Sequence, residues 1–300
     1  MGRIAFVFSG QGAQYPGMGA ELAACSPAAK AVFDMADRIR PGTSAQCFEG
    51  TKEELAQTRN TQPCVFCVDL AAAFALRERG LRPDAVAGFS LGELAALAYV
   101  GVLEPEQAFS LVCDRAAAMH RCIEHSGGGM AAVVGLPAET VEALCARCGA
   151  HAVNYNSPAQ TVAAGTGESL QQLVAAVKAE GGRALPLAVE GPFHSPLMAP
   201  AAAELARCLS TYTLHAPALP VYANATAQSY GSDAAALIIR QVAEPVRWRE
   251  TLENMARDGI DTFYEVGPGK TLCGLIAKTL PDATRFSVEN RASLEEVAPC

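Results

Sequence analysis

A serine flanked by two glycines lies between an apolar segment and a helical pattern in the stretch "VAGFSLGELAALAYVG", residues 86–101. The pattern G-x-S-x-G between a buried strand and a helix is typical of a turn that presents a nucleophilic serine. The glycines relieve crowding in the turn, and the free N–H groups at the helix N-terminus can stabilise an oxyanion. Ser90 is therefore a candidate nucleophile. The alternative is that it only caps the helix.

A nucleophilic serine needs a general base, and histidine is the most frequent choice. The chain has five histidines, which are His120, His125, His151, His194 and His215. Their order in the chain does not choose among them. His194 is favoured because it lies in "EGPFHSPLM", beside a Gly-Pro turn where the chain returns from a predicted insert. Binding and catalytic groups are frequent at such joints.

An arginine shares one face of a predicted helix with apolar residues. In the helical pattern that begins near Pro105, i, i+3 and i+4 spacing places Arg115 in a stripe with alanine, leucine, valine, methionine and cysteine. A buried guanidinium needs an anion or several hydrogen-bond acceptors. Two interpretations remain open, an internal salt bridge and the capture of a substrate carboxylate.

Two loop segments have less specific patterns. Gln11 in "SGQGAQYPGMG" follows a strand and could direct its backbone N–H at an oxyanion, or it could belong to an ordinary polar loop. The segment "EVGPGKTL" could approach a phosphate through its glycines. It lacks the G-x-x-x-x-G-K-[ST] pattern of a phosphate-binding loop.

Composition narrows the class of protein. The 300 residues include 23 Lys+Arg and 31 Asp+Glu, a net charge of −8, which disfavours nucleic acid or an anionic membrane as partner. No apolar run reaches the roughly 18 residues of a membrane-spanning helix. The start of the chain leads into a strand and not a signal peptide, so we expect a cytoplasmic, reduced protein. Two C-x-x-C pairs, Cys64/Cys67 and Cys145/Cys148, fit buried helix faces better than a metal site.

The elements that must position these residues alternate between strand and helix. Short apolar runs at Ile4–Phe8, Ala85–Phe89 and Thr262–Val266 predict buried parallel strands. After Gly127–Gly129 the pattern changes to the order β-α-β-β-α-β, which resembles a ferredoxin-like unit. We therefore expect an α/β fold in which an α/β-hydrolase-like large subdomain with a central parallel sheet, residues 1–125 and 192–300, carries an inserted ferredoxin-like small subdomain, residues 126–191. The last stretch of the chain is expected to be loosely held.

Taken together, these motifs resemble malonyl-CoA:acyl carrier protein transacylases and the related acyltransferase domains of polyketide synthases. The resemblance runs through nearly the whole chain. Its markers are "FVFSGQGAQYPGMG", "TQP" at residues 61–63, "GFSLGE" at 88–93, an arginine 25 residues after the serine, "NYNSPAQTVAAG", "GPFHSPLM", "PVRW" at 245–248 and "YEVGPGKTL".

The resemblance implies a role for each matching residue. Ser90 accepts the acyl group, and His194 acts as its general base and later as the acid. A main-chain carbonyl from around Pro245–Trp248 orients the histidine, so no aspartate is required. Backbone N–H groups of Gln11 and Leu91 form the oxyanion hole.

The resemblance also implies the residues that contact the substrate. Arg115 binds the free malonyl carboxylate, and Asn156 lines the acyl pocket. Phe193 lies immediately before the base, and phenylalanine at this position resembles malonyl-selective domains. Its bulky ring leaves little room for an α-methyl group. One methyl group changes discrimination by only about 1–3 kcal/mol. Many members have histidine before the nucleophile, where this chain has Phe89.

The activity that follows is that of an [acyl-carrier-protein] S-malonyltransferase. Such an enzyme moves malonyl from malonyl-CoA to the phosphopantetheine thiol of acyl carrier protein through a malonyl-serine intermediate, in fatty acid synthesis or, as the alternative, for a polyketide synthase. Two other readings remain open, a serine hydrolase or thioesterase and a catalytically dead carrier-protein docking module. We expect a monomer with malonyl-CoA and acyl carrier protein as partners, and no metal or cofactor.

Overall fold

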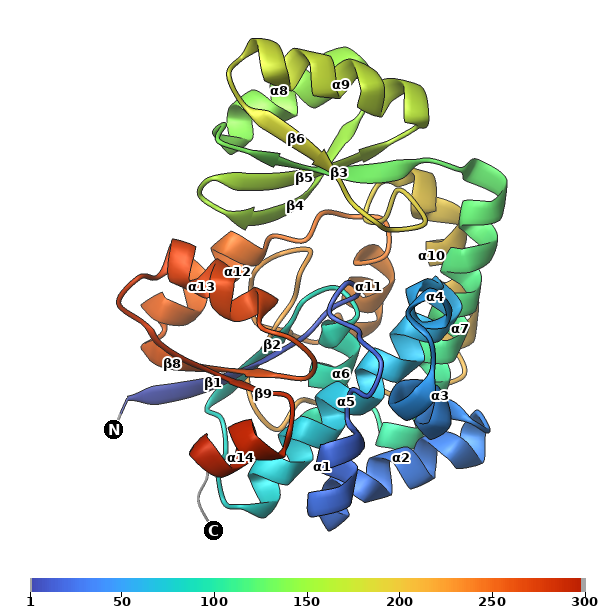
Figure 1. The fold of residues 1–300 in the computed structure, drawn as a ribbon, viewed down its shortest axis with the longest axis vertical. Coiled ribbons are helices and arrows are strands. Elements are labelled where there is room, and N and C mark those ends of the chain that lie inside the picture. Colours follow the sequence, from blue (N-terminus) through green and yellow to red (C-terminus); the bar gives the residue numbers. More distant parts are fainter. Residues whose placement is uncertain (1, 298–300) are drawn as a thin grey trace.

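The computed structural model describes residues 2–297, which form a large subdomain with a small one above it (Figure 1). The large subdomain is built on a five-stranded sheet in the order β7-β2-β1-β8-β9, in which all paired strands are parallel. These strands are β1 (Arg3–Phe8), β2 (Ala85–Gly88), β7 (Val221–Tyr222), β8 (Ile260–Val266) and β9 (Thr284–Val288). The α/β class with a central parallel sheet is confirmed.

The middle strand aligns the ends of its two neighbours. Phe8 of β1 pairs with Gly88 of β2 and with Val266 of β8. The three loops that follow these residues therefore leave the sheet side by side at its carboxyl edge, where ligands bind in open α/β sheets. Two of these loops carry Ser90 and Gln11.

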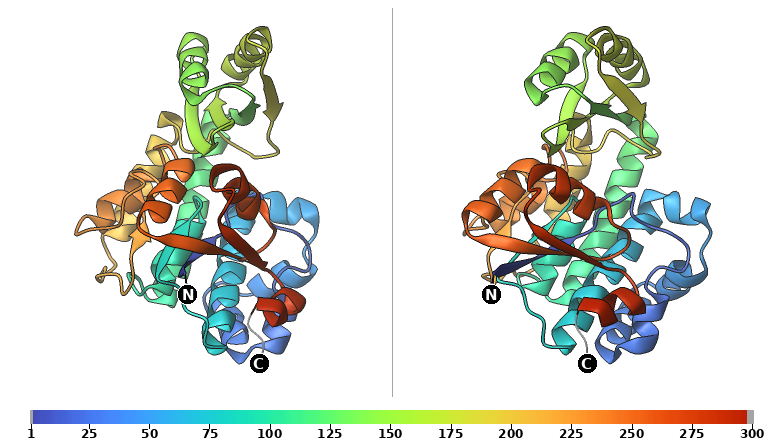
Figure 2. Two further views of the ribbon diagram at one scale, coloured as in Figure 1. Left: turned by 90° about the vertical axis from the view of Figure 1, so that its left-hand side faces the viewer. Right: turned by 60° about the vertical axis from the view of Figure 1, so that its left-hand side comes forward.

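Helices cover both faces of this sheet (Figures 1 and 2). Phe6 and Phe8 pack into the cluster formed by α5, α6 and α7, whereas Ala5 and Val7 pack with α12 and α13. This alternation is the two-residue period of a strand buried on both faces. The helices are α1 (Ala20–Cys25), α2 (Pro27–Ile39), α3 (Thr43–Glu49), α4 (Lys52–Ala56), α5 (Thr58–Glu78), α6 (Gly92–Tyr99), α7 (Pro105–Ser126), α10 (Ala199–Leu209), α11 (Ala234–Arg240), α12 (Trp248–Arg257), α13 (Thr271–Thr279) and α14 (Arg291–Val297), with a 3₁₀ turn at Pro196–Met198. Within residues 2–297, none of these helices is long and apolar enough to cross a membrane.

The small subdomain has the strand order of the predicted ferredoxin-like unit. Its elements are β3 (Gly129–Val134), α8 (Ala138–Cys148), β4 (His151–Ser157), β5 (Gln160–Gly165), α9 (Gly167–Ala179) and β6 (Arg183–Pro186). The four strands form an antiparallel sheet in the order β4-β5-β3-β6, and both helices pack on one face (Figure 1). The β-α-β-β-α-β prediction is confirmed.

Backbone hydrogen bonds at two places help to hold the small subdomain against the large one. The backbone of Val246 pairs with the edge strand β4, with N···O distances of 2.9 Å from Tyr155 and 2.8 Å to Val153. The Glu190 carboxylate, in the segment that returns from the small subdomain, accepts a hydrogen bond of 2.6 Å from the N–H of Thr58 at the start of α5. Strand β4 is thereby fixed above the carboxyl edge of the large sheet.

The end of the chain differs from expectation. As far as residue 297 it is not loosely held, because β9 pairs along five residues with β8 and Leu294 of α14 is buried; residues 298–300 lie outside the described part of the chain. Helix α3 was not predicted. The helical pattern at residues 63–79 of the sequence predicts a helix that starts at the proline, but α5 begins at Thr58 and contains Pro63. The earlier start is stabilised by the distant Glu190, which sequence patterns cannot reveal.

Helix α5 also carries a buried carboxyl group. Asp69 is fully buried, and neither of its oxygens has a hydrogen-bond partner among residues 2–297. Burial, and then the nearby Glu265 carboxylate, raise the pKa of Asp69 well above its usual value. Glu265 instead accepts hydrogen bonds from the N–H groups of Leu272 (2.9 Å) and Cys273 (2.7 Å) at the start of α13. Asp69 is therefore the carboxyl of this pair that is most favoured to hold a proton.

We predict that Asp69→Asn stabilises the protein at about pH 8 and has little effect at about pH 4. A carboxyl whose pKa is raised by folding contributes stability that is present below its unfolded pKa of about 3.9 and is lost as the pH rises towards the folded pKa. The amide cannot ionise, and each unit of pKa difference corresponds to about 1.4 kcal/mol. Urea titrations at both pH values, with the exposed Asp282→Asn as control, measure the effect. Equal stabilisation at the two pH values would contradict the prediction.

Candidate active site

The serine turn is held by close backbone packing. Strand β2 ends at Gly88, α6 begins at Gly92, and Ser90 between them has a positive φ of 53°. A Cβ on Gly88 would lie 2.0 Å from the carbonyl carbon of Gly92, and a Cβ on Gly92 would lie 2.3 Å from the carbonyl oxygen of Phe8. Only glycine fits at either position, which explains the G-x-S-x-G pattern. Ser90 does not cap α6, because Leu91 occupies the cap position and no side chain caps this helix.

The Ser90 hydroxyl faces a buried histidine. His194 Nε2 lies 2.7 Å from Ser90 Oγ, and its Nδ1 lies 2.8 Å from the main-chain carbonyl oxygen of Gln241. A carbonyl only accepts hydrogen bonds, so Nδ1 carries the hydrogen and Nε2 is free to accept the serine proton. Burial, and then the Arg115 cation, lower the pKa of His194 to about 4. The imidazole is therefore neutral at neutral pH and able to act as a base.

The main-chain carbonyl that orients His194 does not come from the segment that the family resemblance implies. We expected it from around Pro245–Trp248, and it comes from Gln241, which directly follows α11. The Pro245–Trp248 segment instead pairs with β4 through Val246 and buries Trp248 beneath Phe89. The prediction failed because a carbonyl acceptor can come from any residue, so nothing in the sequence marks it.

Arg115 lies in the core and points at the serine. The residue is 1% exposed, and its Nη1 and Nη2 groups donate to the side-chain oxygens of Gln62 (2.7 Å) and Gln241 (2.9 Å). Nη2 also lies 3.4 Å from Ser90 Oγ. Burial lowers the pKa of Arg115 to about 10, and the Glu93 carboxylate partly opposes this effect. The guanidinium remains charged at neutral pH.

The internal salt bridge considered for Arg115 does not form. Within residues 2–297, no carboxylate pairs with it, and its Nε atom has no hydrogen-bond partner. Its two partners are neutral amide oxygens, which satisfy N–H groups without cancelling a charge. The site therefore contains a buried cation that has no anion.

Two backbone N–H groups beside the serine are free. In the described part of the chain, neither the Gln11 nor the Leu91 N–H donates a hydrogen bond. The Gln11 loop lies against the serine turn, because a Cβ on Gly10 would be 2.6 Å from the carbonyl oxygen of Phe89. Free amides next to a nucleophile are the donors that an oxyanion requires.

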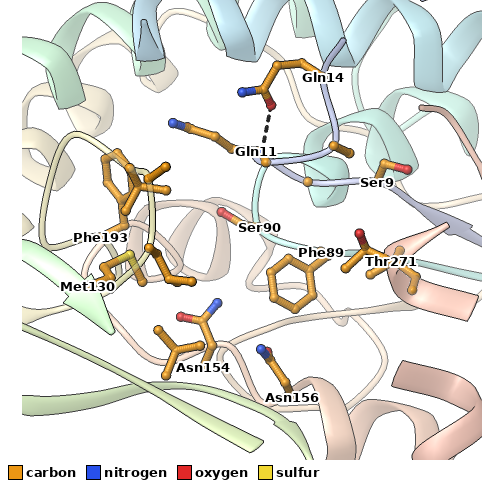
Figure 3. Close-up of a pocket in the computed structure, with 18 of the residues that line it drawn as sticks. Ser9, Gln11, Gln14, Phe89, Ser90, Met130, Asn154, Asn156, Phe193 and Thr271 are labelled. Carbon is orange, nitrogen blue, oxygen red and sulfur yellow. Dashed lines mark hydrogen bonds between the residues drawn. The ribbon is translucent and has the colours of Figure 1, made fainter. Parts of the chain in front are cut away.

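Ser90, His194 and Gln11 line a cavity of about 530 Å³ between the two subdomains (Figure 3). Gln11, Ser90 and Phe193 line it from the large subdomain, and Asn154 and Asn156 line it from β4. Both asparagine Oδ1 atoms are buried and have no partner among the residues described. Asn156 Nδ2 donates to the side-chain oxygen of Gln160 at 3.2 Å. The cavity is thus apolar in the main, with the two asparagines on its β4 wall.

Two other histidines do not line the cavity, whereas the segment "EVGPGKTL" lines it through Glu265, Thr271 and Leu272. His125 contacts the Arg121 carbonyl at the surface, and His120 faces Glu124 and Glu190. In "EVGPGKTL" the Gly269 N–H donates to Glu289 at 2.9 Å, so this amide already has a carboxylate partner. Across residues 2–297, no group of three or more His, Cys, Asp or Glu is arranged to hold a metal ion.

Sequence reasoning missed three residues that hold the site together. Gln62 and Gln241 contact Arg115, and Asn224 Oδ1 accepts the Ser90 N–H at 2.7 Å. Gln62 gave a usable signal, because it is a polar residue within an apolar helical pattern. Gln241 and Asn224 come from loops with no spacing relation to the serine.

Comparisons with known proteins agree in family and fold. The model of the acyl transferase domain family matches residues 5–298. The malonyl CoA-acyl carrier protein transacylase of Bacillus subtilis (strain 168) is 36% identical over 304 residues, which cover 98% of this chain and 96% of that protein. The crystal structure of the malonyl transacylase from Streptococcus pneumoniae superposes with a TM-score of 0.95 at 37% identity and covers 99% of both chains. A malonyl-transacylase in complex with a type II polyketide synthase acyl-carrier protein gives a TM-score of 0.95 at 35% identity, again over 99% of both chains.

We predict that Gly88→Ala destabilises the protein by about 1–3 kcal/mol or more, because the new methyl group would overlap the backbone of Gly92. Gly167→Ala is the matched control. It lies at the first position of α9 with no atom within 4 Å of its Cβ, so alanine should stabilise the helix by about 0.5–1 kcal/mol. Urea unfolding measures both changes, and a Gly88→Ala protein as stable as the wild type would refute the turn geometry.

Proposed function

Since this chain belongs to the acyl transferase domain family, we propose that it transfers a malonyl group from malonyl-CoA to the phosphopantetheine thiol of acyl carrier protein, in fatty acid synthesis. The observation that carries this proposal is the buried Arg115 cation without an anion, 3.4 Å from Ser90 Oγ. An acyl group on Ser90 that ends in a carboxylate would supply the missing negative charge. Malonyl has such a carboxylate, and acetyl does not.

The first half-reaction loads the serine. His194 Nε2 takes the proton of the Ser90 hydroxyl while Oγ attacks the thioester carbonyl carbon. The backbone N–H groups of Gln11 and Leu91 stabilise the tetrahedral oxyanion. Collapse of this intermediate breaks the carbon–sulfur bond, and the imidazolium returns its proton to the sulfur of CoA. The product is malonyl-Ser90.

The second half-reaction runs the same steps towards a different thiol. The phosphopantetheine sulfur of the carrier gives its proton to His194 and attacks the ester carbonyl. The Ser90 oxygen leaves and recovers the proton. Because one site serves both thiols in turn, the kinetics are ping-pong. The reaction uses only acid–base and acyl-transfer steps, so the proposed mechanism requires no metal or redox cofactor.

A discrete acyltransferase for a polyketide synthase is the second candidate. The specific observation in its favour is the similarity to the malonyl-transacylase solved with a type II polyketide synthase carrier. Both candidates share the same chemistry and differ only in the carrier protein. A serine hydrolase remains the more distant alternative, because a neutral His194 could also activate water.

Several finer assignments belong to the same proposal. Asn156 and Phe193 contact the acyl or pantetheine part of the substrate, and the phenyl ring of Phe193 restricts an α-methyl group. Residues 1–125 with 192–300 and residues 126–191 act as the two structural units. The protein works in the cytoplasm as a monomer.

Transfer itself is the test of this function. With malonyl-CoA and holo acyl carrier protein, we predict that the wild type forms malonyl-carrier and that Ser90→Ala forms none. Intact-mass spectrometry also shows a malonyl adduct on the wild type alone. Release of free malonate without carrier acylation would replace the proposal with the hydrolase alternative, and labelling of Ser90→Ala would remove the nucleophile assignment.

We further predict that Arg115→Ala lowers kcat/KM for malonyl-CoA at least about 30-fold and leaves acetyl-CoA unaffected or better used. A lost buried charge pair costs about 2–5 kcal/mol, and only malonyl forms the pair. Arg121→Ala on the same helix is the matched control, because Arg121 pairs with Glu204 at the exposed surface. An unchanged malonyl-to-acetyl ratio would contradict the role of Arg115.

A further inference from the structure

A buried glutamate lies just behind the reacting groups without touching the hydroxyl or the imidazole. Glu93 is in the first turn of α6, three residues after Ser90, and is 1% exposed. Its Oε1 accepts a hydrogen bond from the Tyr230 hydroxyl. Its Oε2 accepts from the Asn224 backbone N–H at 3.1 Å and from Gln241 Nε2 at 3.4 Å. These three donors offset the free-energy cost of burying the carboxylate, which would be large without them.

The first of these contacts leads to the nucleophile turn. The backbone N–H of Asn224 donates a hydrogen bond to Glu93. The side chain of Asn224 forms hydrogen bonds with two residues of the serine turn. Its Oδ1 accepts the Ser90 N–H at 2.7 Å, and its Nδ2 donates to the Gly88 carbonyl at 2.6 Å. The position of Asn224 therefore sets where the strained residue Ser90 sits.

The second contact leads to Gln241 and decides which way its amide faces. Gln241 Nε2 donates to the Glu93 carboxylate and to the Ser90 carbonyl. An ionised carboxylate only accepts hydrogen bonds, so the NH₂ end of the amide must face Glu93. The oxygen end must then face Arg115, which donates to it at 2.9 Å. The same residue orients His194 through its main-chain carbonyl.

We propose that Glu93 is a positioning residue whose ionised carboxylate holds Asn224 and Gln241 in the arrangement that makes the serine reactive. The inference rests on the proposed function, since the reaction it supports is the malonylation of Ser90. A protonated Glu93 would present a donor where two donors now converge. The Gln241 amide would lose an acceptor that fixes its orientation. Arg115 would lose the nearby negative charge that raises its pKa.

This glutamate is expected to change its protonation state near neutral pH. Burial raises the pKa of Glu93 to about 7, and the hydrogen bonds from Tyr230, Asn224 and Gln241 and the Arg115 charge oppose the rise. The titratable and charged groups that face it are Tyr230 and Arg115, with His194 beyond Gln241 and Asp233 near Tyr230. The ionised form therefore grows as the pH rises through about 7.

The consequence is a pH dependence that the base itself would not produce. The pKa of His194 is lowered to about 4, so its neutral form is complete well below neutral pH. We expect the rate constant for malonylation of Ser90 to rise with pH around 7 because of Glu93. That assignment can be tested by changing Glu93 or its donor while leaving Ser90, His194 and Arg115 in place.

The experiment is single-turnover malonylation of Ser90 by malonyl-CoA, followed by quenched-flow mass spectrometry from about pH 5.5 to about pH 9. Glu93→Gln should lose the pH step near 7 and react up to about 100-fold more slowly at about pH 8, as expected for misplaced reacting groups. Tyr230→Phe removes one donor to the carboxylate, so the midpoint should move upward by about one pH unit. Tyr264→Phe, a buried tyrosine on β8 outside the site, should leave the midpoint unchanged.

The outcomes separate this inference from the proposed function. A wild-type protein that malonyl-CoA does not label would refute the function itself. A wild type that is labelled, with the same rate and midpoint in Glu93→Gln and no shift in Tyr230→Phe, would overturn the role of Glu93. Circular dichroism checks that each variant is folded, and if Glu93→Gln does not fold, the direction of the Tyr230→Phe shift decides. In steady state the effect should appear in kcat more than in KM, which a purely structural role would not require.

Discussion

One glutamine joins the three groups that the proposed reaction needs. The Gln241 main-chain oxygen accepts from His194, its side-chain oxygen accepts from Arg115, and its side-chain nitrogen donates to the Ser90 carbonyl. A neutral amide suits this place better than a carboxylate would. A carboxylate would pair with the guanidinium and would have to be displaced by the substrate's own anion, at the cost of a buried ion pair. The amide oxygen holds Arg115 in place and leaves its charge uncompensated.

The same reasoning applies to the base. A carboxylate beside His194 would raise the imidazole pKa and favour the charged form, whereas a carbonyl orients the ring and fixes the tautomer without adding a charge. The nearby Arg115 cation pushes the pKa in the opposite direction. A histidine that is buried next to a cation and oriented by a neutral group is held ready to accept a proton. Protonating this buried imidazole costs free energy. In the proposed reaction the oxyanion forms at the same time, and its negative charge stabilises the imidazolium.

The sequence was most informative where a short pattern corresponds to one local structure. Gly88 and Gly92 are required by contacts shorter than 3 Å, and the order of strands and helices after residue 126 predicts the ferredoxin-like unit. It was least informative where remote backbone groups meet. The Gln241 carbonyl lies 47 residues from its partner His194, the Asn224 side chain lies 134 residues from Ser90, and the Glu190 carboxylate lies 132 residues from Thr58. Nothing in the spacing of a chain shows contacts of that kind, and the pairing of β9 with β8 was missed for the same reason.

The folded protein accommodates each buried ionisable group near the site in a different way. These differences show why each position has its particular residue type. Neither Asp69 oxygen has a hydrogen-bond partner among residues 2–297, so burial favours its neutral form, and Glu265 is satisfied by two N–H groups at the start of α13. Arg115 has neither an anion nor a realistic route to neutrality, because even a pKa lowered to about 10 leaves it charged. A buried lysine in the same place would lose up to about 3–5 pKa units and much of its charge. A permanent cation at a buried site therefore requires arginine, and in the proposed reaction the folded protein carries its desolvation cost until an acyl group with a free carboxylate binds.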